Sequence, residues 1–402
     1  MQVIPYAAQW IDESDIQAVT KVLRSPFLTQ GPAIHALERA LAEVVGVAEA
    51  VAVSNGTAAL HLASEALGVG PGSIGVVAPI SFSATANCLR YCGAEVRFSD
   101  VDPLTGLMDP HSLDQVLAQV SQETDKGIVI PVSLAGRVPR LSEIKAVAAK
   151  YNVPVLEDAA QSFGAFEEDL GGRYLSASCV HSEAATFSFH PVKHICAGEG
   201  GAVLTNNPEL ADRVRFMRSH GIVRPFAAES KDPISEPPWY YEQHDLGFNY
   251  RITDIQCALA LSQLEKQPFF MERRRALADR YYQKFSEEPF RRCFDCPSTH
   301  PGHAYHLFVI HFKDGFSRDD AHAYLKAHGI MTQVHHVPIY KHPYYVNRYG
   351  EQSLPGAEAY FKNCLSIPLY PKLKFSEQDR VIQALETYCN QSIAREGSTL
   401  SV

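Results

Sequence analysis

A lysine between two apolar, strand-like segments is the residue of this chain best suited to covalent chemistry. Lys193 follows the apolar run 184–189 and precedes a glycine-rich turn that leads into a second such run, 202–205. Burial at this position would remove water from the ammonium group, which lowers the pKa of the amine and makes it available as a Schiff-base nucleophile. Lys193 could also be an ordinary loop lysine, so other residues must decide between the two interpretations.

Two earlier strand-like runs are followed by groups that could hold a phosphate and an aromatic ring. Gly56 and Thr57 stand between the run 50–53 and a helix-forming segment. Backbone N–H groups and a hydroxyl at a helix N-terminus can bind phosphate, although the same residues could serve only as an N-cap. Phe82 follows the run 75–78 closely enough to lie over a bound ring, although a single aromatic residue is more often part of a core.

A carboxylate follows another buried run in the same way. Asp158 comes just after the run 153–156, where a carboxylate needs a cationic partner. A protonated pyridine nitrogen would be one such partner, and the alternative is an N-cap aspartate. Because ligands bind at the carboxyl ends of strands in open parallel sheets, these groups should meet. A phosphate site, a stacking ring, a carboxylate and a lysine are together what pyridoxal phosphate (PLP) requires.

Short apolar runs alternate with helix-length connections from residue 50 onward. The runs are 50–53, 75–78, 94–99, 127–131, 153–156, 185–189 and 202–205. This alternation predicts an α/β fold with a mostly parallel, seven-stranded sheet that helices cover on both faces.

The two ends of the chain do not show this alternation of strands and helices. Residues 12–25 and 33–45 carry apolar residues at helical spacing, and the segment 26–32 between them predicts a loop. After residue 264 we predict a long charged helix 265–285 interrupted near its start by Pro268, strands 306–312 and 331–337, and helices 318–328 and 376–388. We therefore expect an N-terminal segment 1–30, a large domain 31–264 and a smaller α+β domain 265–402.

Composition excludes several classes of function. The chain has 402 residues with 46% apolar and 20% charged residues, no apolar run of membrane-spanning length, and a net charge of -9, which argues against a nucleic-acid partner. No secretion signal precedes it, and nine scattered cysteines fit a reducing compartment, so a cytoplasmic location is expected. Cys293 and Cys296 form a single C-x-x-C without a second pair, so we predict no metal site.

Four motifs carry a resemblance to a known family over nearly the whole chain. They are S-N-G-T-A-A-L, E-D-A-A-Q, F-S-F-H-P-V-K-H and D-L-G-F-N-Y-R-I-T-D-I-Q. The chain resembles the DegT/DnrJ/EryC1/StrS sugar aminotransferases, which are fold-type I PLP enzymes. The resemblance implies that PLP is held covalently, as an aldimine, by Lys193, that Asp158 pairs with the pyridine nitrogen, and that Phe82 stacks on the ring.

The same resemblance implies the remaining roles in the site. Gln161 would bind the ring hydroxyl, Gly56, Thr57 and Ser188 would hold the phosphate, and Asn249 would reach the phosphate of the neighbouring subunit in a homodimer with shared active sites. Substrate contacts are implied for Tyr6, Pro26, Phe27, Leu28, Thr29, Gln333, Val334, His335 and His336.

The implied reaction is amino transfer from L-glutamate to C4 of a UDP-4-keto-6-deoxy-N-acetylhexosamine, as in the pseudaminic acid pathway. Close relatives often carry histidine at position 161, Thr-Thr at 196–197 and an aromatic residue at 336, where this chain has Gln161, Cys196-Ala197 and His336. Another nucleotide-linked 4- or 3-keto sugar, or a non-catalytic PLP-binding regulator, therefore remains an alternative. Dehydratases of the family have histidine in place of the lysine, so Lys193 argues against that activity.

Overall fold

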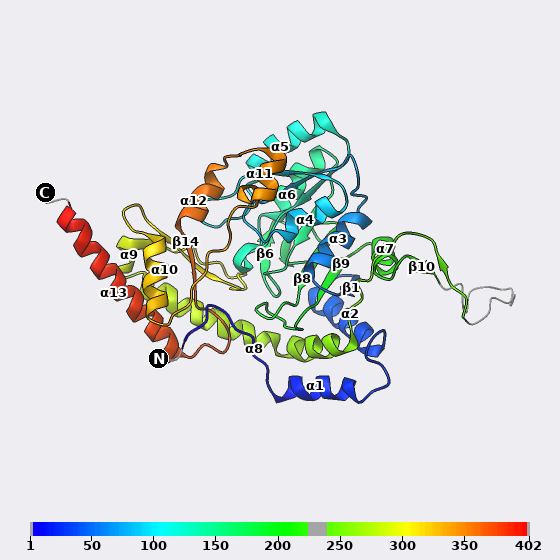
Figure 1. The fold of residues 1–402 in the computed structure, drawn as a ribbon, viewed down its shortest axis with the longest axis horizontal. Helices are drawn as coiled ribbons and strands as arrows, with labels where there is room; N and C mark the ends of the chain where they lie inside the picture. Colours follow the sequence, from blue (N-terminus) through cyan, green and yellow to red (C-terminus); the bar gives the residue numbers. More distant parts are fainter. Residues whose placement is uncertain (1–2, 224–238, 400–402) are drawn as a thin grey trace.

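The centre of the protein is a seven-stranded sheet (Figure 1), in a computed structural model that describes residues 3–223 and 239–399. Its strands are β1 (Glu49–Val53), β2 (Ile74–Val77), β3 (Glu95–Phe98), β4 (Gly127–Ile130), β5 (Leu156–Asp158), β8 (Ala184–Ser188) and β9 (Gly201–Thr205). Parallel bridges from Val129 to Val155 and from Val132 to Asp158 join the group β3-β2-β4 to the group β5-β8-β9-β1. Only β9 runs antiparallel to its neighbours, so the predicted mostly parallel sheet is confirmed.

Helices cover both faces of the sheet because alternate strand residues point to opposite sides. Ala52 packs in a core cluster with α2 (Pro32–Val45) and the first turns of α8 (Asp254–Phe285). The next residue, Val53, packs in a different cluster with α3 (Gly56–Ala66). A fully buried sheet explains why the strands read as continuous apolar runs.

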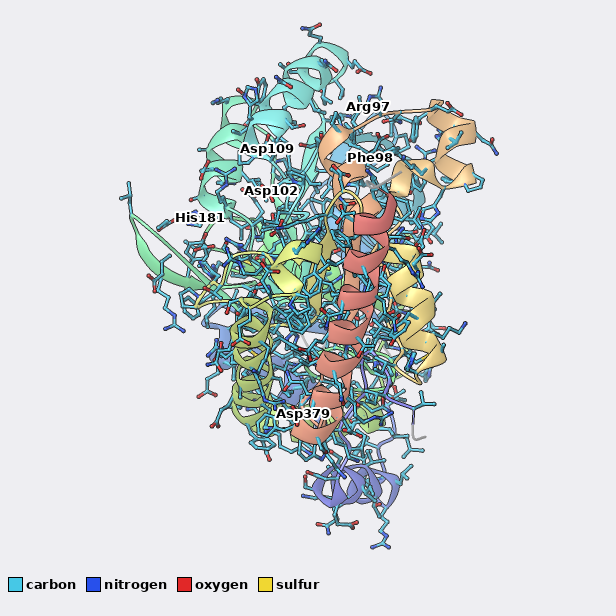
Figure 2. The ribbon with its side chains drawn as sticks, turned by 90° about the vertical axis from the view of Figure 1, so that its left-hand side faces the viewer. Arg97, Phe98, Asp102, Asp109, His181 and Asp379 are labelled. Atoms are coloured by element: carbon cyan, nitrogen blue, oxygen red, sulfur yellow. The ribbon has the colours of Figure 1, made fainter. Side chains whose placement is uncertain are left out.

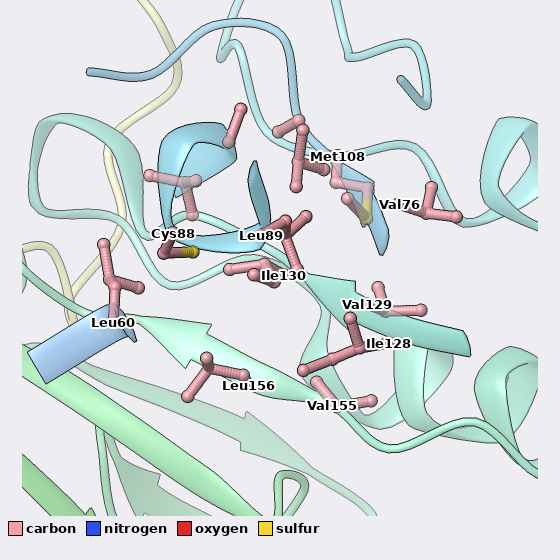
Figure 3. Close-up of a cluster of buried hydrophobic side chains, with 14 of the residues drawn as sticks. Leu60, Val76, Cys88, Leu89, Met108, Ile128, Val129, Ile130, Val155 and Leu156 are labelled. Carbon is pink, nitrogen blue, oxygen red and sulfur yellow. The ribbon is translucent and has the colours of Figure 1, made fainter. Parts of the chain in front are cut away.

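Figure 3 shows part of the larger cluster, where the middle strands meet α3 and α4 (Ala84–Tyr91). Leu60 from α3 and Leu89 from α4 lie over Ile130 of β4 and Leu156 of β5 in this view, and all four are buried. This packing holds the two helices whose N-termini face the end of the sheet.

The remaining elements surround this core or form a smaller lobe. In the N-terminal and large part they are α1 (Glu13–Leu23), α5 (Pro110–Glu123), α6 (Leu141–Lys150), β6 (Phe166–Asp169), β7 (Gly172–Leu175), α7 (Pro208–Arg218), β10 (Ile222–Val223) and β11 (Glu242–Gln243). The smaller lobe contains α9 (Phe290–Cys293), β12 (Phe294–Asp295), β13 (Phe308–Phe312), α10 (Arg318–Ala327), β14 (Cys364–Ile367) and α13 (Phe375–Thr399). The same part of the chain supplies α11 (Pro343–Tyr349) and α12 (Pro355–Asn363), whose Tyr345 and Tyr360 pack in the core cluster of the large sheet (Figure 1). Figure 2 shows α13 along the outside of this lobe, with Asp379 near its first turn.

One continuous helix, α8, connects the two lobes, and its predicted start at residue 265 is wrong. The helix begins at Asp254 because Thr253 and Gln256 form a capping box at its N-terminus. Pro268, which lacks an N–H group and was the reason to expect an interruption, lies inside the helix. The predicted boundary after residue 264 thus falls within α8, and the division into domains stays a prediction.

The predicted strand 331–337 is also wrong. Gln333 forms a single bridge there, through its backbone N–H and C=O with Ser366 of β14, at 3.1 and 2.8 Å, and the Met331 N–H donates to the Ile4 carbonyl at 2.9 Å, but no strand forms. Val334, His335 and His336 line a cavity instead. An irregular backbone presents three consecutive side chains to one space, whereas a strand would turn alternate ones away.

The start of β9 lies against the turn between β1 and α3. A Cβ atom built on Gly201 would lie 2.6 Å from the carbonyl carbon of Asn55 and 2.8 Å from the backbone nitrogen of Gly56. Real Cβ atoms do not approach backbone that closely, so a side chain at residue 201 must displace the start of α3.

We therefore expect Gly201→Ala to cost about 1–3 kcal/mol of stability through overpacking. Gly70→Ala is the matched control, because a Cβ atom on Gly70 would meet nothing within 4 Å. Thermal unfolding of both variants beside the wild type checks this expectation. Equal melting temperatures for the two variants would contradict it.

Candidate active site

A cavity of about 960 Å³ lies at the carboxyl ends of β1, β2, β5 and β8, where residues of the smaller lobe complete its wall. Twelve of the predicted site residues line it: Tyr6, Gly56, Thr57, Phe82, Asp158, Gln161, Ser188, Lys193, Gln333, Val334, His335 and His336. The structure therefore brings together residues from strand ends that are far apart in the sequence, as expected for an open parallel sheet.

Lys193 lies in the turn after β8, and its environment favours a neutral amine. Burial lowers the pKa of the Lys193 amine to about 8, and the nearby negative charge of Asp158 acts in the opposite direction. The backbone N–H of Lys193 donates to the carbonyl of His190 at 2.9 Å, which fixes the turn. With this pKa, about a tenth of the amine is unprotonated at pH 7, far more than for a lysine of ordinary pKa, and this neutral form is the Schiff-base nucleophile.

Asp158 is buried at the end of β5 and is held by two donors. Its Oδ2 accepts a hydrogen bond from the Thr85 hydroxyl at 2.7 Å, and its Oδ1 accepts one from the Ala160 N–H at 3.2 Å. Burial raises the pKa of the Asp158 carboxyl, while these hydrogen bonds and Lys193 act to lower it. A cation placed beside this carboxylate would stabilise its charged form. Thr85 was not predicted, and its only signal in the sequence is its position one turn after Phe82.

Gln161 is oriented by the backbone of a neighbouring turn. Its Oε1 accepts a hydrogen bond from the Ala135 N–H at 2.8 Å. This contact assigns the oxygen to the protein side and leaves the NH₂ group to donate to a molecule in the cavity. A hydroxyl or phenolate oxygen is a suitable acceptor for that group.

The N-terminus of α3 forms a concave backbone surface beside Ser188. The Asn55 side chain caps the helix by accepting from the Ala58 N–H at 2.8 Å. A Cβ atom on Gly56 would lie 2.8 Å from the Cβ atom of Ser188, so a side chain there would fill the space between α3 and β8. Backbone N–H groups and hydroxyls at a helix N-terminus suit a phosphate group.

These observations test whether the cavity suits PLP, and the residues fit it. Gly56, Thr57 and Ser188 would hold the phosphate, Asp158 would face the ring nitrogen, and Lys193 supplies the amine. Phe82 lines the same cavity with 65% of its surface exposed, so its ring is free to contact a ligand.

The other predicted residues do not line this cavity within the described chain. Residues 26–29 and Asn249 are exposed at the surface. Residues 28 and 29 pack against the start of α8, where the Asp254 N–H donates to the Leu28 carbonyl at 3.0 Å and Thr29 pairs with Thr253, whereas Asn249 pairs with Ser219. If these residues contact a substrate or cofactor, they must do so in a site other than that of their own chain.

Comparison with known proteins agrees with this geometry. The sequence profile of the DegT/DnrJ/EryC1/StrS aminotransferase family matches residues 9–386. The chain belongs to this family. The family resemblance predicted from the sequence motifs is therefore confirmed.

Three relatives show how far the similarity extends. The chain is 36% identical to the spore coat polysaccharide biosynthesis protein SpsC of Bacillus subtilis, over 95% of this chain and 96% of that protein. It is 34% identical to a UDP-4-amino-4,6-dideoxy-N-acetyl-β-L-altrosamine transaminase of Campylobacter jejuni, over 93% and 94% of the two chains. Helicobacter pylori PseC, a solved aminotransferase involved in pseudaminic acid biosynthesis, has a TM-score of 0.86 and 28% identity, over 97% and 100%.

These findings confirm the fold-type I α/β class and the enzyme class, a PLP-dependent sugar aminotransferase. The roles of single residues stay predictions. Sequence reasoning did not identify His306, a buried histidine of the smaller lobe that also lines the cavity. His306 comes just before β13, and no periodic pattern in the sequence there indicates that its side chain lines a cavity.

The effect of Asp158 on Lys193 can be measured in the cofactor-free protein. The pKa of Lys193 is expected to be about 8 in the wild type, and Asp158→Asn should lower it because the carboxylate favours the ammonium form. Labelling Lys193 with acetic anhydride across a pH series, with quantification by mass spectrometry, gives both values. The other lysines serve as internal references, and an unchanged or higher value in Asp158→Asn would show that the charges do not interact.

Proposed function

We propose that this enzyme transfers the amino group of L-glutamate to C4 of a UDP-4-keto-6-deoxy-N-acetylhexosamine, giving UDP-4-amino-4,6-dideoxy-N-acetyl-β-L-altrosamine, as in pseudaminic acid biosynthesis. The observation that carries the aminotransferase activity is the meeting of Lys193 and Asp158 in one cavity. The sugar is supported by similarity to the Campylobacter jejuni transaminase and to Helicobacter pylori PseC.

PLP, when bound, supplies an electron sink for the substrate carbon. The Lys193 amine, which we propose binds PLP covalently, also takes up and returns the proton of the carbon that carries the amino group. Asp158 would keep a proton on the ring nitrogen, and Thr85 holds the carboxylate in place through its 2.7 Å hydrogen bond. Phe82 would cover one face of the ring, and Gln161 would donate to the ring oxygen.

The N-terminal segment and the smaller lobe form the proposed sugar-binding wall. The ring of Tyr6 lies 5.4 Å from the ring of His335, and the Tyr6 carbonyl accepts from the Leu369 N–H at 3.1 Å. The Nδ1 atom of His335 shares a 2.9 Å hydrogen bond with the Ser366 hydroxyl. These contacts attach the first residues to the lobe and present Tyr6, His335 and His336 to one space.

A second candidate is another nucleotide-linked keto sugar. The similarity to SpsC, a spore coat polysaccharide biosynthesis protein, is of the same extent as the similarity to the transaminase. His336, which replaces the usual aromatic residue, changes the lining of the cavity beside Phe82, 6.5 Å away between ring centroids. A different sugar substituent could be recognised there.

A panel of keto sugars separates these candidates. The enzyme with PLP and glutamate should aminate the UDP-4-keto-6-deoxy-N-acetylhexosamine at C4, as identified by mass and NMR, while UDP- and dTDP-linked 4- and 3-keto sugars serve as competitors. Lys193→Ala should form no product, because it lacks the nucleophile and the proton carrier. Amination of another sugar alone would replace the proposed substrate, and no amination at all would refute the proposed activity.

We also propose that the enzyme is a cytoplasmic homodimer in which each active site contains residues of both chains. Asn249 and residues 26–29 support this assembly, because they are exposed and lie outside the cavity of their own chain. No helix in the described part of the chain is long and apolar enough to cross a membrane.

Mixed dimers test the shared site. Lys193→Ala and Asn249→Asp should each be inactive, the second because it places a negative charge beside the phosphate. In a mixed dimer one site would carry both changes and the other neither, so random pairing of equal amounts should restore roughly a quarter of wild-type activity. Absence of recovery, with mixed dimers demonstrated by native mass spectrometry, would mean that Asn249 acts within its own chain.

A further inference from the structure

The part of the cavity wall that one chain supplies is poor in groups that could bind a carboxylate. Among the described lining residues there is no arginine, and Lys193 is the only lysine. The wall also contains two acids, Asp158 and Glu199. An amino acid that donates its amino group brings a carboxylate on the reacting carbon, next to Lys193. That carboxylate needs charge-assisted hydrogen bonds, and the groups nearby that could give them are imidazoles.

His306 is the buried imidazole of this wall. Only 4% of its surface is exposed, and its Nδ1 atom has no hydrogen-bond partner within the described structure. Its ring centroid lies 5.7 Å from that of His194, which in turn bonds the Ala304 carbonyl at 2.9 Å. A buried polar atom without a partner is costly, and because Nδ1 is itself closed off from the cavity, the ring must turn before a ligand can bond this atom and remove the cost.

A buried cation, Arg274, contacts the backbone of His306. The guanidinium of Arg274 on α8 has 2% exposure and donates to the carbonyls of Tyr305, His306 and Leu369 at 2.9, 3.3 and 3.4 Å. No carboxylate pairs with Arg274 within residues 3–223 and 239–399. Its positive charge is therefore offset only by carbonyl dipoles, and it favours an anion on the cavity side of His306.

The surroundings of His306 favour the neutral form of its imidazole when no ligand is bound. Burial, Lys193, His194, Arg274 and His335 all lower the pKa of the His306 imidazole. These are the charged or titratable groups that face it from the turn after β8, from α8 and from the segment after residue 331. A bound anion would raise the pKa of the His306 imidazole, because its negative charge would offset the repulsion between an imidazolium and the neighbouring positive charges.

We propose that His306, supported by Arg274, forms the binding site for the α-carboxylate of the amino donor. This inference rests on the proposed function in taking an α-amino acid as donor, and it adds the residue that recognises that donor. His306 binds the carboxylate through a ring N–H group, and Arg274 acts as a positioning residue that holds the 305–306 backbone and supplies positive potential. The keto sugar has no carboxylate at its reacting carbon, so His306 discriminates between the two substrates of one cavity.

Two half-reactions starting from the same PLP-loaded enzyme test this proposal. Loss of the PLP absorbance is followed after addition of glutamate, and separately after addition of the amino-sugar product, which reverses the second half-reaction. His306→Leu, which removes the ring N–H donor at similar side-chain size, should lower kcat/KM for glutamate about 10- to 100-fold, the effect of losing a hydrogen bond to a charged group, and change the value for the amino sugar less than about twofold. His311→Leu is the matched control, because His311 is a buried histidine of β13 that does not line the cavity.

Binding of unreactive probes gives a readout that does not depend on turnover. Calorimetry should show that His306→Leu weakens binding of glutarate by a similar factor and leaves binding of UDP unchanged, while His311→Leu affects neither. Equal losses in both half-reactions, or weaker UDP binding with unchanged glutarate binding, would overturn the assignment. If wild-type enzyme does not react with glutamate but its amino-sugar reaction proceeds, the proposed donor is wrong, and the glutarate measurement alone decides whether His306 binds a carboxylate.

Discussion

Removal of water from a lysine and an aspartate in one cavity is the constraint on which the rest of this structure depends. A surface lysine is protonated and unreactive near neutral pH, whereas burial lowers the pKa of Lys193 to about 8. The same burial raises the pKa of Asp158 and would leave the carboxyl protonated if nothing opposed it. This rise in pKa is opposed by hydrogen bonds from Thr85 and Ala160 and by the charge of Lys193. The charge states that we propose for catalysis therefore depend on the surroundings of both groups.

Close backbone packing at one end of the sheet keeps that arrangement rigid. Gly201 lies against the turn at Asn55, and Gly56 lies against Ser188, with no space for a Cβ atom at either glycine. The start of α3, the end of β8 and the start of β9 therefore form one unit. Lys193 belongs to the turn that joins β8 to β9, so a shift of α3 would disturb the phosphate site and the lysine together.

The smaller lobe contributes the chemistry that distinguishes substrates. Arg274 fastens the backbone before β13 to α8, and the hydrogen bond between His335 and Ser366 fastens the segment after residue 331 to β14. Both segments present histidines to the cavity, whereas the sheet presents the groups that fit the cofactor. One half of the site could thus change its substrate without altering the residues that we propose hold PLP.

The sequence by itself determined the sheet and the cofactor groups, because both follow from local signals. Buried strands read as apolar runs, and the residues after them reach the same edge of any parallel sheet, so Lys193, Asp158 and Gly56 could be placed together without coordinates. Only the tertiary structure decided features that depend on distant contacts. The capping box at Thr253 starts α8 at Asp254 rather than at residue 265, and the helix continues through Pro268. Strand pairing ends at Gln333, so residues 334–336 are free to line the cavity. The backbone of His306 is held by Arg274, 32 residues away, and the hydroxyl of Thr85 is bonded to Asp158, 73 residues away. No local sequence pattern predicts partners at such distances.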